Sequence, residues 1–194
     1  MARKSPAGTL KRGLAKIGKL WKKQQFDRAL AELEALIAAR QDNAQLLVMR
    51  SQLIRLQEKE EGHPTLDDAR NDLETAAALD EQSPIPLIEL GYFHYVIDDD
   101  ARAALPQFER ATACCKRLLR ESLLGQAGAL EELGRTTEAR ECLIQALALF
   151  LGHDEEAGYP SDDEIINRLK NLQDPETSRA GVPRTTLTAR QRSG

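Results

Sequence analysis

The residues of this chain with the greatest potential for chemistry are its three cysteines and three histidines. The thiols belong to Cys114, Cys115 and Cys142, and the imidazoles to residues 63, 94 and 153. No two cysteines have the C-x-x-C spacing, and no two histidines lie four residues apart on a helix face. A structural zinc ion needs about four such ligands that converge in a tetrahedron. The sequence therefore predicts no metal site and no cofactor.

The cysteines themselves favour a structural role. An odd number of cysteines, two of them adjacent, is a poor disulfide framework and fits a reducing, cytoplasmic setting. A nucleophilic thiol would need a partly exposed pocket with a base nearby. We expect small, buried, reduced side chains instead. The neighbouring Lys116 and Arg117 leave a redox role open.

The acidic run at residues 98–100 is the next candidate, and it does not form a known ion-binding loop. It lacks the glycine and the distal glutamate of an EF-hand. Carboxylates just before a helix interact favourably with the positive end of its dipole, which predicts a structural role. The chain also lacks a phosphate-binding loop, a nucleophile elbow and a dinucleotide fingerprint. We therefore predict that the protein is not an enzyme.

Composition indicates which elements position these residues. The 194 residues are 41% hydrophobic, 30% charged and 4% aromatic. Ala, Leu, Glu, Arg and Gln are strong helix formers, and an all-β protein would contain more aromatic and β-branched residues. No apolar run approaches the ~18 residues of a membrane-spanning helix. The basic first stretch has no continuous apolar core, so we expect no secretory signal.

Charge is distributed unevenly along the chain. Residues 1–28 carry nine Lys or Arg and one acid, and residues 29–178 carry fourteen bases and thirty acids. Residues 179–194 carry four Arg and no acid. A basic head and a basic tail thus flank an acidic body, which suggests that the ends contact an acidic partner or the body itself.

The main organising feature is an internal repeat. Four short sequence segments, which we call phrases, resemble one another. In each phrase a small residue is followed by apolar residues at a spacing that places them on one helix face. Their anchors are separated by 40, 35 and 35 residues, at Ala29, Ala69, Ala104 and Ala139. Each phrase follows another apolar helical segment, and these segments cover residues 10–22, 44–60, 85–97 and 120–133. The sequence therefore predicts four helix-turn-helix units in series.

Turn and capping signals separate these helices. Ser83-Pro84 predicts a helix start, with serine as N-cap and proline as the first helical residue. Thr65 and Ser161 each begin a capping box, completed by Asp68 and Glu164. Gly134 predicts the end of a helix.

This pattern resembles the tetratricopeptide repeat family, whose period is about 34 residues. The motifs that carry the resemblance are Leu90-Gly91 in the third unit, Leu133-Gly134-Arg-Thr-Thr-Glu-Ala139 in the fourth and Leu79-Asp80 at the end of the second. In the first unit Gly13 and Ile17 stand where the family has a bulky residue and a small one. The resemblance implies an all-α, right-handed superhelical solenoid of about four helix-turn-helix repeats.

The resemblance also implies a binding site. In this family the first helix of each unit lines a concave groove, which here would hold a peptide or helix of a partner protein. The expected groove residues are Trp21, Met49, Gln52, Arg55, Ile88, Glu89, Tyr92, Tyr95, Leu124 and Glu131. Trp, Tyr, Met and Arg are enriched at binding hot spots. We predict a non-catalytic scaffold or adaptor, and a chaperone-like holder of a client protein remains the alternative.

The ends of the chain complete the predicted organisation. We expect a flexible basic N-terminus over residues 1–9, the repeat domain over 10–150, a capping helix over 161–173 and a disordered basic tail over 174–194. The first helix carries a basic patch of Lys11, Lys16, Lys19, Lys22 and Lys23. The apolar periodicity runs unbroken into the next segment, which favours a plain first repeat helix. Contact of the basic patch with nucleic acid or an anionic membrane surface, and a transit segment, are the alternatives.

Overall fold

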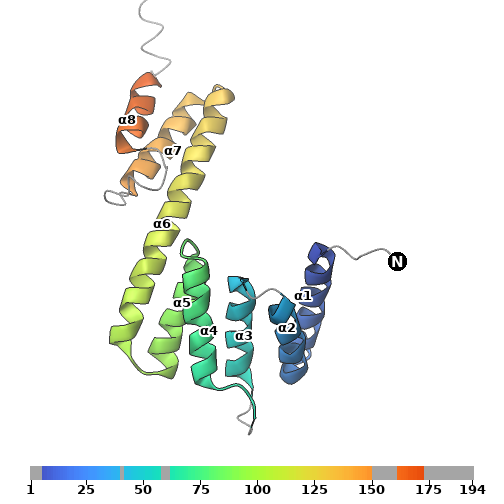
Figure 1. Ribbon diagram of the computed structural model, residues 1–194. Coiled ribbons are helices and arrows are strands. Elements are labelled where there is room, and N and C mark those ends of the chain that lie inside the picture. Colours follow the sequence, from blue (N-terminus) through green and yellow to red (C-terminus); the bar gives the residue numbers. More distant parts are fainter. Residues whose placement is uncertain (1–5, 40–41, 58–61, 150–160, 173–194) are drawn as a thin grey trace, which may run out of the picture. The chain divides into compact units, whose positions relative to one another are not determined.

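The computed structural model describes residues 6–39, 42–57, 62–149 and 161–172 of this chain. Every regular element within these ranges is a helix (Figure 1). The all-α fold class predicted from composition and periodicity is therefore confirmed. None of the described helices combines the length and the apolar character needed to cross a membrane.

The helices follow the predicted order with adjusted bounds. They are α1 (Pro6–Lys22), α2 (Phe26–Ala39), α3 (Ala44–Leu56), α4 (Leu66–Leu79), α5 (Pro84–Tyr92), the π-helix η1 (Phe93–Ile97), α6 (Ala101–Glu132), α7 (Thr136–Ala148) and α8 (Asp162–Asn171). The chain divides into two compact units, Met1–Cys115 (unit 1) and Lys116–Gly194 (unit 2).

In unit 1, consecutive helices from α1 to α5 pack against one another (Figure 1). They enclose one large core, in which the fully buried side chains include Ile17, Leu33, Leu46, Leu53, Leu73 and Phe93. A smaller cluster joins α4 and α5 to the first part of α6, through Ala77, Leu87, Ala111 and Cys114. The repeated apolar phrases of the sequence therefore face the interior, as their spacing predicts.

Unit 2 has its own core between the second part of α6, α7 and α8. Its buried residues include Ala127, Ala139, Leu143, Ala146 and Ile165. Two ion pairs add to the apolar contact of α8, from Arg120 of α6 to Asp162 and from Arg168 to Glu131 of α6 at 2.9 Å. Helix α8 thus covers the apolar side of the preceding helix pair.

Three boundaries differ from the sequence-based expectation. The predicted break between the third and fourth units is absent, because α6 runs without interruption for 32 residues. Strong helix formers make up seven of the nine residues 113–121, and no proline or glycine lies between Phe108 and Gly125 to end the helix. Helix α1 begins at Pro6, so four residues expected in the flexible N-terminus are helical. Helix α3 ends at Leu56, before the residue 60 that we expected.

The local start and stop signals act as predicted. The hydroxyl of Thr65 accepts a hydrogen bond from the backbone N–H of Asp68, and the Asp68 carboxylate accepts one from the Thr65 backbone N–H. The backbone N–H and the hydroxyl of Thr65 both donate to the Asp68 carboxylate and lower its pKa. Ser83 and Ser161 cap α5 and α8 through their hydroxyls, which accept hydrogen bonds from the backbone N–H groups of Ile85 and Glu164. Gly134, two residues after the end of α6, adopts a left-handed φ of +71°, where an L side chain would be strained. The linker after Phe150 and the C-terminal tail lie outside the described residues.

One polar cluster is buried between α3 and α4. Asp72 is 7% exposed, and its Oδ1 accepts a hydrogen bond of 3.2 Å from Arg50. Its Oδ2 and the hydroxyl of Ser51 are buried without a hydrogen-bond partner among the described residues. Burial raises the pKa of Asp72 to about 6, with smaller contributions from the negative charges of Asp68 and Glu34, while Arg50 opposes the shift.

The raised pKa predicts a pH-dependent stability. Because folded Asp72 holds its proton more tightly than the unfolded chain does, its contribution to stability is present at pH 4 and is lost as the pH rises to about 6. We compare the free energy of unfolding of the Asp72→Asn variant with that of the wild type. This difference should favour the variant by about 2–3 kcal/mol more at pH 7 than at pH 4. Urea unfolding at both pH values measures this difference. Parallel pH profiles for the two proteins would contradict the assignment.

Two glycines mark close approaches between helices in unit 1. A Cβ atom added to Gly91 of α5 would lie 2.8 Å from the ring of Phe108 in α6. A Cβ atom added to Gly13 of α1 would lie 2.7 Å from a methyl group of Leu36 in α2. The glycine at position 13 thus leaves room for the Leu36 side chain between α1 and α2.

The contact at Gly91 predicts opposite effects for two glycine substitutions. We expect Gly91→Ala to destabilise the fold by about 1–2 kcal/mol, because Phe108 must move. Gly125 is the matched control, since its added Cβ atom would meet nothing within 4 Å in mid-helix. Gly125→Ala should stabilise by about 0.5–1 kcal/mol through helix propensity. Chemical denaturation measures both, and equal effects would contradict the packing described here.

Candidate functional site

Eight of the ten residues expected to line a groove lie in unit 1. Trp21 is on α1, Met49, Gln52 and Arg55 are on α3, Ile88, Glu89 and Tyr92 are on α5, and Tyr95 is on η1. The other two, Leu124 and Glu131, belong to unit 2. The two groups are therefore described separately.

Polar bonds join three of these residues across two helices. Glu89 of α5 accepts a hydrogen bond of 2.8 Å from the Gln52 amide and one of 2.5 Å from Arg55. Gln52 and Arg55 are three residues apart on α3, so both reach α5 from the same side. The Arg55 and Glu89 side chains are only 20% and 24% exposed. This arrangement fixes α3 against α5 and leaves the carboxylate of Glu89 occupied on both oxygens.

Two exposed tyrosines follow Glu89 along the chain. Tyr92 is 52% exposed and Tyr95 is 57% exposed. The Tyr92 ring meets the Phe108 ring edge-on, with the centroids 5.1 Å apart. One side of Tyr92 is thus supported by α6, and Tyr95 has more of its surface free. We call the set of Gln52, Arg55, Glu89, Tyr92 and Tyr95 the α3–α5 face.

The backbone that carries Tyr95 is a π-helix, which the sequence analysis did not foresee. Phe93 at its start is fully buried, and the N–H of Asp98 bonds to the Phe93 carbonyl at 3.2 Å. Val96 and Ile97 are exposed together with Tyr95. A single extra residue per turn rotates side chains relative to an α-helix, and such insertions are frequent at functional sites.

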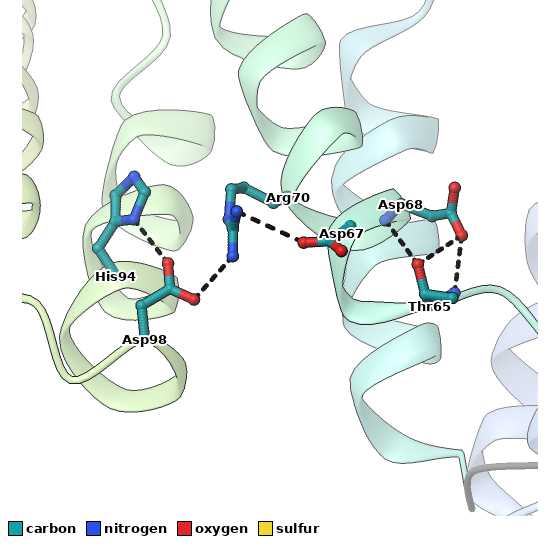
Figure 2. Close-up of polar contacts among 6 residues, drawn as sticks. All are labelled: Thr65, Asp67, Asp68, Arg70, His94 and Asp98. Atoms are coloured by element: carbon teal, nitrogen blue, oxygen red, sulfur yellow. Dashed lines mark hydrogen bonds and ion pairs between the residues drawn. The ribbon is translucent and has the colours of Figure 1, made fainter.

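A network of side chains anchors this π-helix to α4 (Figure 2). The Asp98 carboxylate lies 2.9 Å from Nδ1 of His94 and accepts a bond of 2.9 Å from Arg70 of α4. The Arg70 guanidinium also lies over the Phe93 ring, 5.5 Å from its centroid. Arg70 makes a further ion pair of 3.4 Å with Asp67 in its own helix. The tyrosine-bearing segment is therefore held at several points.

The acidic run at residues 98–100 has the structural role that its position predicts. Asp98 belongs to the network above, and Asp100 accepts hydrogen bonds from the backbone N–H groups of Arg102 and Ala103 at the start of α6. Asp99 lies between them with a left-handed φ of 52°. These three residues turn the chain from η1 into α6.

Several expected groove residues are not on an open surface. Leu124 is 8% exposed and belongs to the core of unit 2, so its expected position was wrong. The cause is the helical phase of α6, in which Leu124 packs together with Leu123 and Ala127. Glu131 is paired with Arg168 of α8. Trp21, Met49 and Ile88 are partly buried against the cores of unit 1.

The three cysteines of the described part of the chain differ in exposure. Cys114 and Cys142 are buried, Cys115 is exposed, and all three are free thiols. The thiol of Cys114 lies 3.6 Å from the Glu81 carbonyl oxygen, and that of Cys142 lies 3.4 Å from Gln126. The described residues hold no group of three or more His, Cys, Asp or Glu side chains that could bind a metal ion. His153 lies outside the described residues.

The ion pair within the α3–α5 face can be tested by a double-mutant cycle with Arg55→Ala and Glu89→Ala. We expect a coupling energy of about 1 kcal/mol or more, because both groups are largely buried and removal of one leaves the other without its charge partner. The exposed pair Arg135–Glu138 serves as the control and should couple more weakly. Urea unfolding gives all the required free energies. Equal coupling in the two cycles would contradict the described burial.

No family model and no curated protein matches this chain. Among the solved structures with a similar fold are two that are each 20% identical in sequence. One is titled "Crystal structure of MamA protein", covers 90% of this chain and 95% of that chain, and has a TM-score of 0.46. The other is titled "Crystal structure of MamA", covers 84% and 96%, and has a TM-score of 0.41. The functional proposal below therefore depends on the geometry of the α3–α5 face.

Proposed function

We propose that this protein is a non-catalytic interaction scaffold, and that the α3–α5 face binds a segment of a partner protein. The observation that carries the proposal is the half-exposure of Tyr92 and Tyr95 on a backbone that buried contacts hold in place. Tyrosine provides a large contact area and a hydroxyl at a low cost in conformational entropy. An aromatic surface that is already held in place can bind a partner without rearranging, which lowers the entropic cost of binding.

The chemistry of the face defines the kind of segment that fits it. Because Glu89 already accepts bonds from Gln52 and Arg55, the polar part of the face is mostly satisfied internally. The free capacity lies in the tyrosine rings and hydroxyls, next to the exposed Val96 and Ile97. We infer a partner segment, extended or helical, with one or two apolar anchors and backbone groups that bond to the hydroxyls. The resemblance to tetratricopeptide repeats supports the same class of partner.

Identification of the partner is the first step of the test. A photo-crosslinking amino acid at position 95 should link the partner in cells, and the same group at the exposed Glu74 of α4 is the control position. A protein that is linked from position 95 alone can be purified for direct binding measurements. Equal labelling from both positions would contradict a specific site on the α3–α5 face.

The binding energy should concentrate on Tyr95. We expect Tyr95→Ala to weaken binding of that partner at least tenfold, which corresponds to about 1.4 kcal/mol. The melting temperature of the Tyr95→Ala variant should stay close to that of wild type, because the Tyr95 ring is largely exposed. Leu79→Ala on α4 removes another exposed apolar side chain and should not change the affinity. Calorimetric titration measures both, and an unchanged affinity for Tyr95→Ala would contradict the proposal.

A further inference from the structure

Helix α1 presents a second surface of unit 1 that the proposed function does not use. Its cationic side chains are all exposed, and no acid occurs within it. At about 100° per residue these cations occupy roughly 140° of the helix circumference. They are Lys11, Arg12, Lys16, Lys19 and Lys22, with Lys23 directly after the helix. We call this set the basic face of α1.

The opposite side of α1 is already occupied by the protein itself. Ile17 is fully buried in the core of unit 1, and Leu10, Leu14, Leu20 and Trp21 pack against the same core. An amphipathic helix binds a membrane surface by burying its apolar side among the lipid tails. That side is unavailable here, so the structure disfavours the membrane-bound arrangement that the sequence alone allowed.

The acidic residues of the adjacent helix α2 leave most of the basic face uncompensated. Glu32 pairs with Lys16, which lies at the margin of the face. Asp27 accepts a hydrogen bond from Gln57, and Glu34 lies 3.9 Å from Arg50. Within the described residues, no ion pair engages Lys11, Lys19 or Lys22. These three ammonium groups are therefore available to an anionic partner.

The shape of the face suits close approach of a charged backbone. Gly8, Ala15 and Gly18 lie between the cations on the exposed side, and a Cβ atom on either glycine would meet nothing within 4 Å. The ammonium groups thus flank a strip of small residues, Gly8, Ala15 and Gly18, on the surface of α1. From Lys11 to Lys22 the strip is about 16 Å long, a length over which duplex DNA presents about ten phosphate charges.

We propose that the basic face of α1 binds the phosphate backbone of duplex nucleic acid without reading its sequence. Trp21, the aromatic residue of α1, packs edge-on against Phe26, so no ring on this face is available to stack on unpaired bases. The high charge density of a duplex complements the clustered cations better than a dispersed acidic surface does. Residues 29–178 are acidic and repel phosphates, so within unit 1 contact is limited to this face.

The direct test is binding of the full-length protein to a 20-base-pair DNA duplex of arbitrary sequence, followed by fluorescence anisotropy at several salt concentrations. We expect a Kd of about 10⁻⁵ M and a slope of log K against log salt of about −3 to −4. The triple variant Lys11→Gln/Lys19→Gln/Lys22→Gln should bind at least tenfold more weakly at low salt, with a slope smaller by about 3.

The matched control is Arg102→Gln/Arg110→Gln/Lys116→Gln, which removes three exposed cations of α6 and changes the net charge equally. It should bind duplex DNA like wild type, and circular dichroism should show that both variants are folded. Equal loss in both triple variants, or unchanged binding in the α1 variant, would overturn the proposal. Tighter binding to vesicles with 30% phosphatidylserine than to DNA would also overturn it. So would sedimentation data in which the wild-type protein self-associates and the α1 variant loses this self-association but still binds DNA.

Discussion

The packing of Phe108 against the bare backbone of Gly91 is the contact on which the α3–α5 face depends. Because position 91 has no side chain, α6 approaches α5 closely enough for the ring to fill that space. Tyr92 then rests edge-on against the same ring. The next residue, Phe93, is directed into the core, where Arg70 covers its ring and ties the π-helix to α4. A larger residue at position 91 would disturb each of these contacts in turn.

The periodicity of apolar residues predicted the helical class, the order of the helices and most of the core. Capping and turn residues such as Thr65, Ser83 and Gly134 also marked real helix ends, because their effects are local. The continuous α6 was not foreseen, since the four-unit pattern suggested a turn where no turn residue exists. The π-helix was not predicted because its extra residue per turn depends on tertiary contacts. Phe93 and Asp98 are both fixed by Arg70 of α4, and a local sequence pattern does not contain this information.

The expected groove residues differ in whether the structure brings them together. Gln52, Arg55 and Glu89 lie together because α3 and α5 contact each other in space, although α4 separates them in sequence. Leu124 was expected in the groove, but it lies in the core of unit 2. Its orientation depends on the phase of α6, which joins the last helix of the third predicted unit to the first helix of the fourth. For α1 the cations were evident from the sequence. The structure added that its apolar side is buried and that α2 compensates mainly Lys16.

Hydrogen–deuterium exchange of the full-length chain, with and without its crosslinked partner protein, tests the central claim most directly. If the α3–α5 face is the binding site, the partner should slow exchange in residues 50–56 and 88–98, which carry Gln52, Arg55, Glu89, Tyr92 and Tyr95. Exchange in α7 and α8 should stay unchanged. Protection confined to α7 and α8, or to α1, would contradict the account and place the partner elsewhere on the protein.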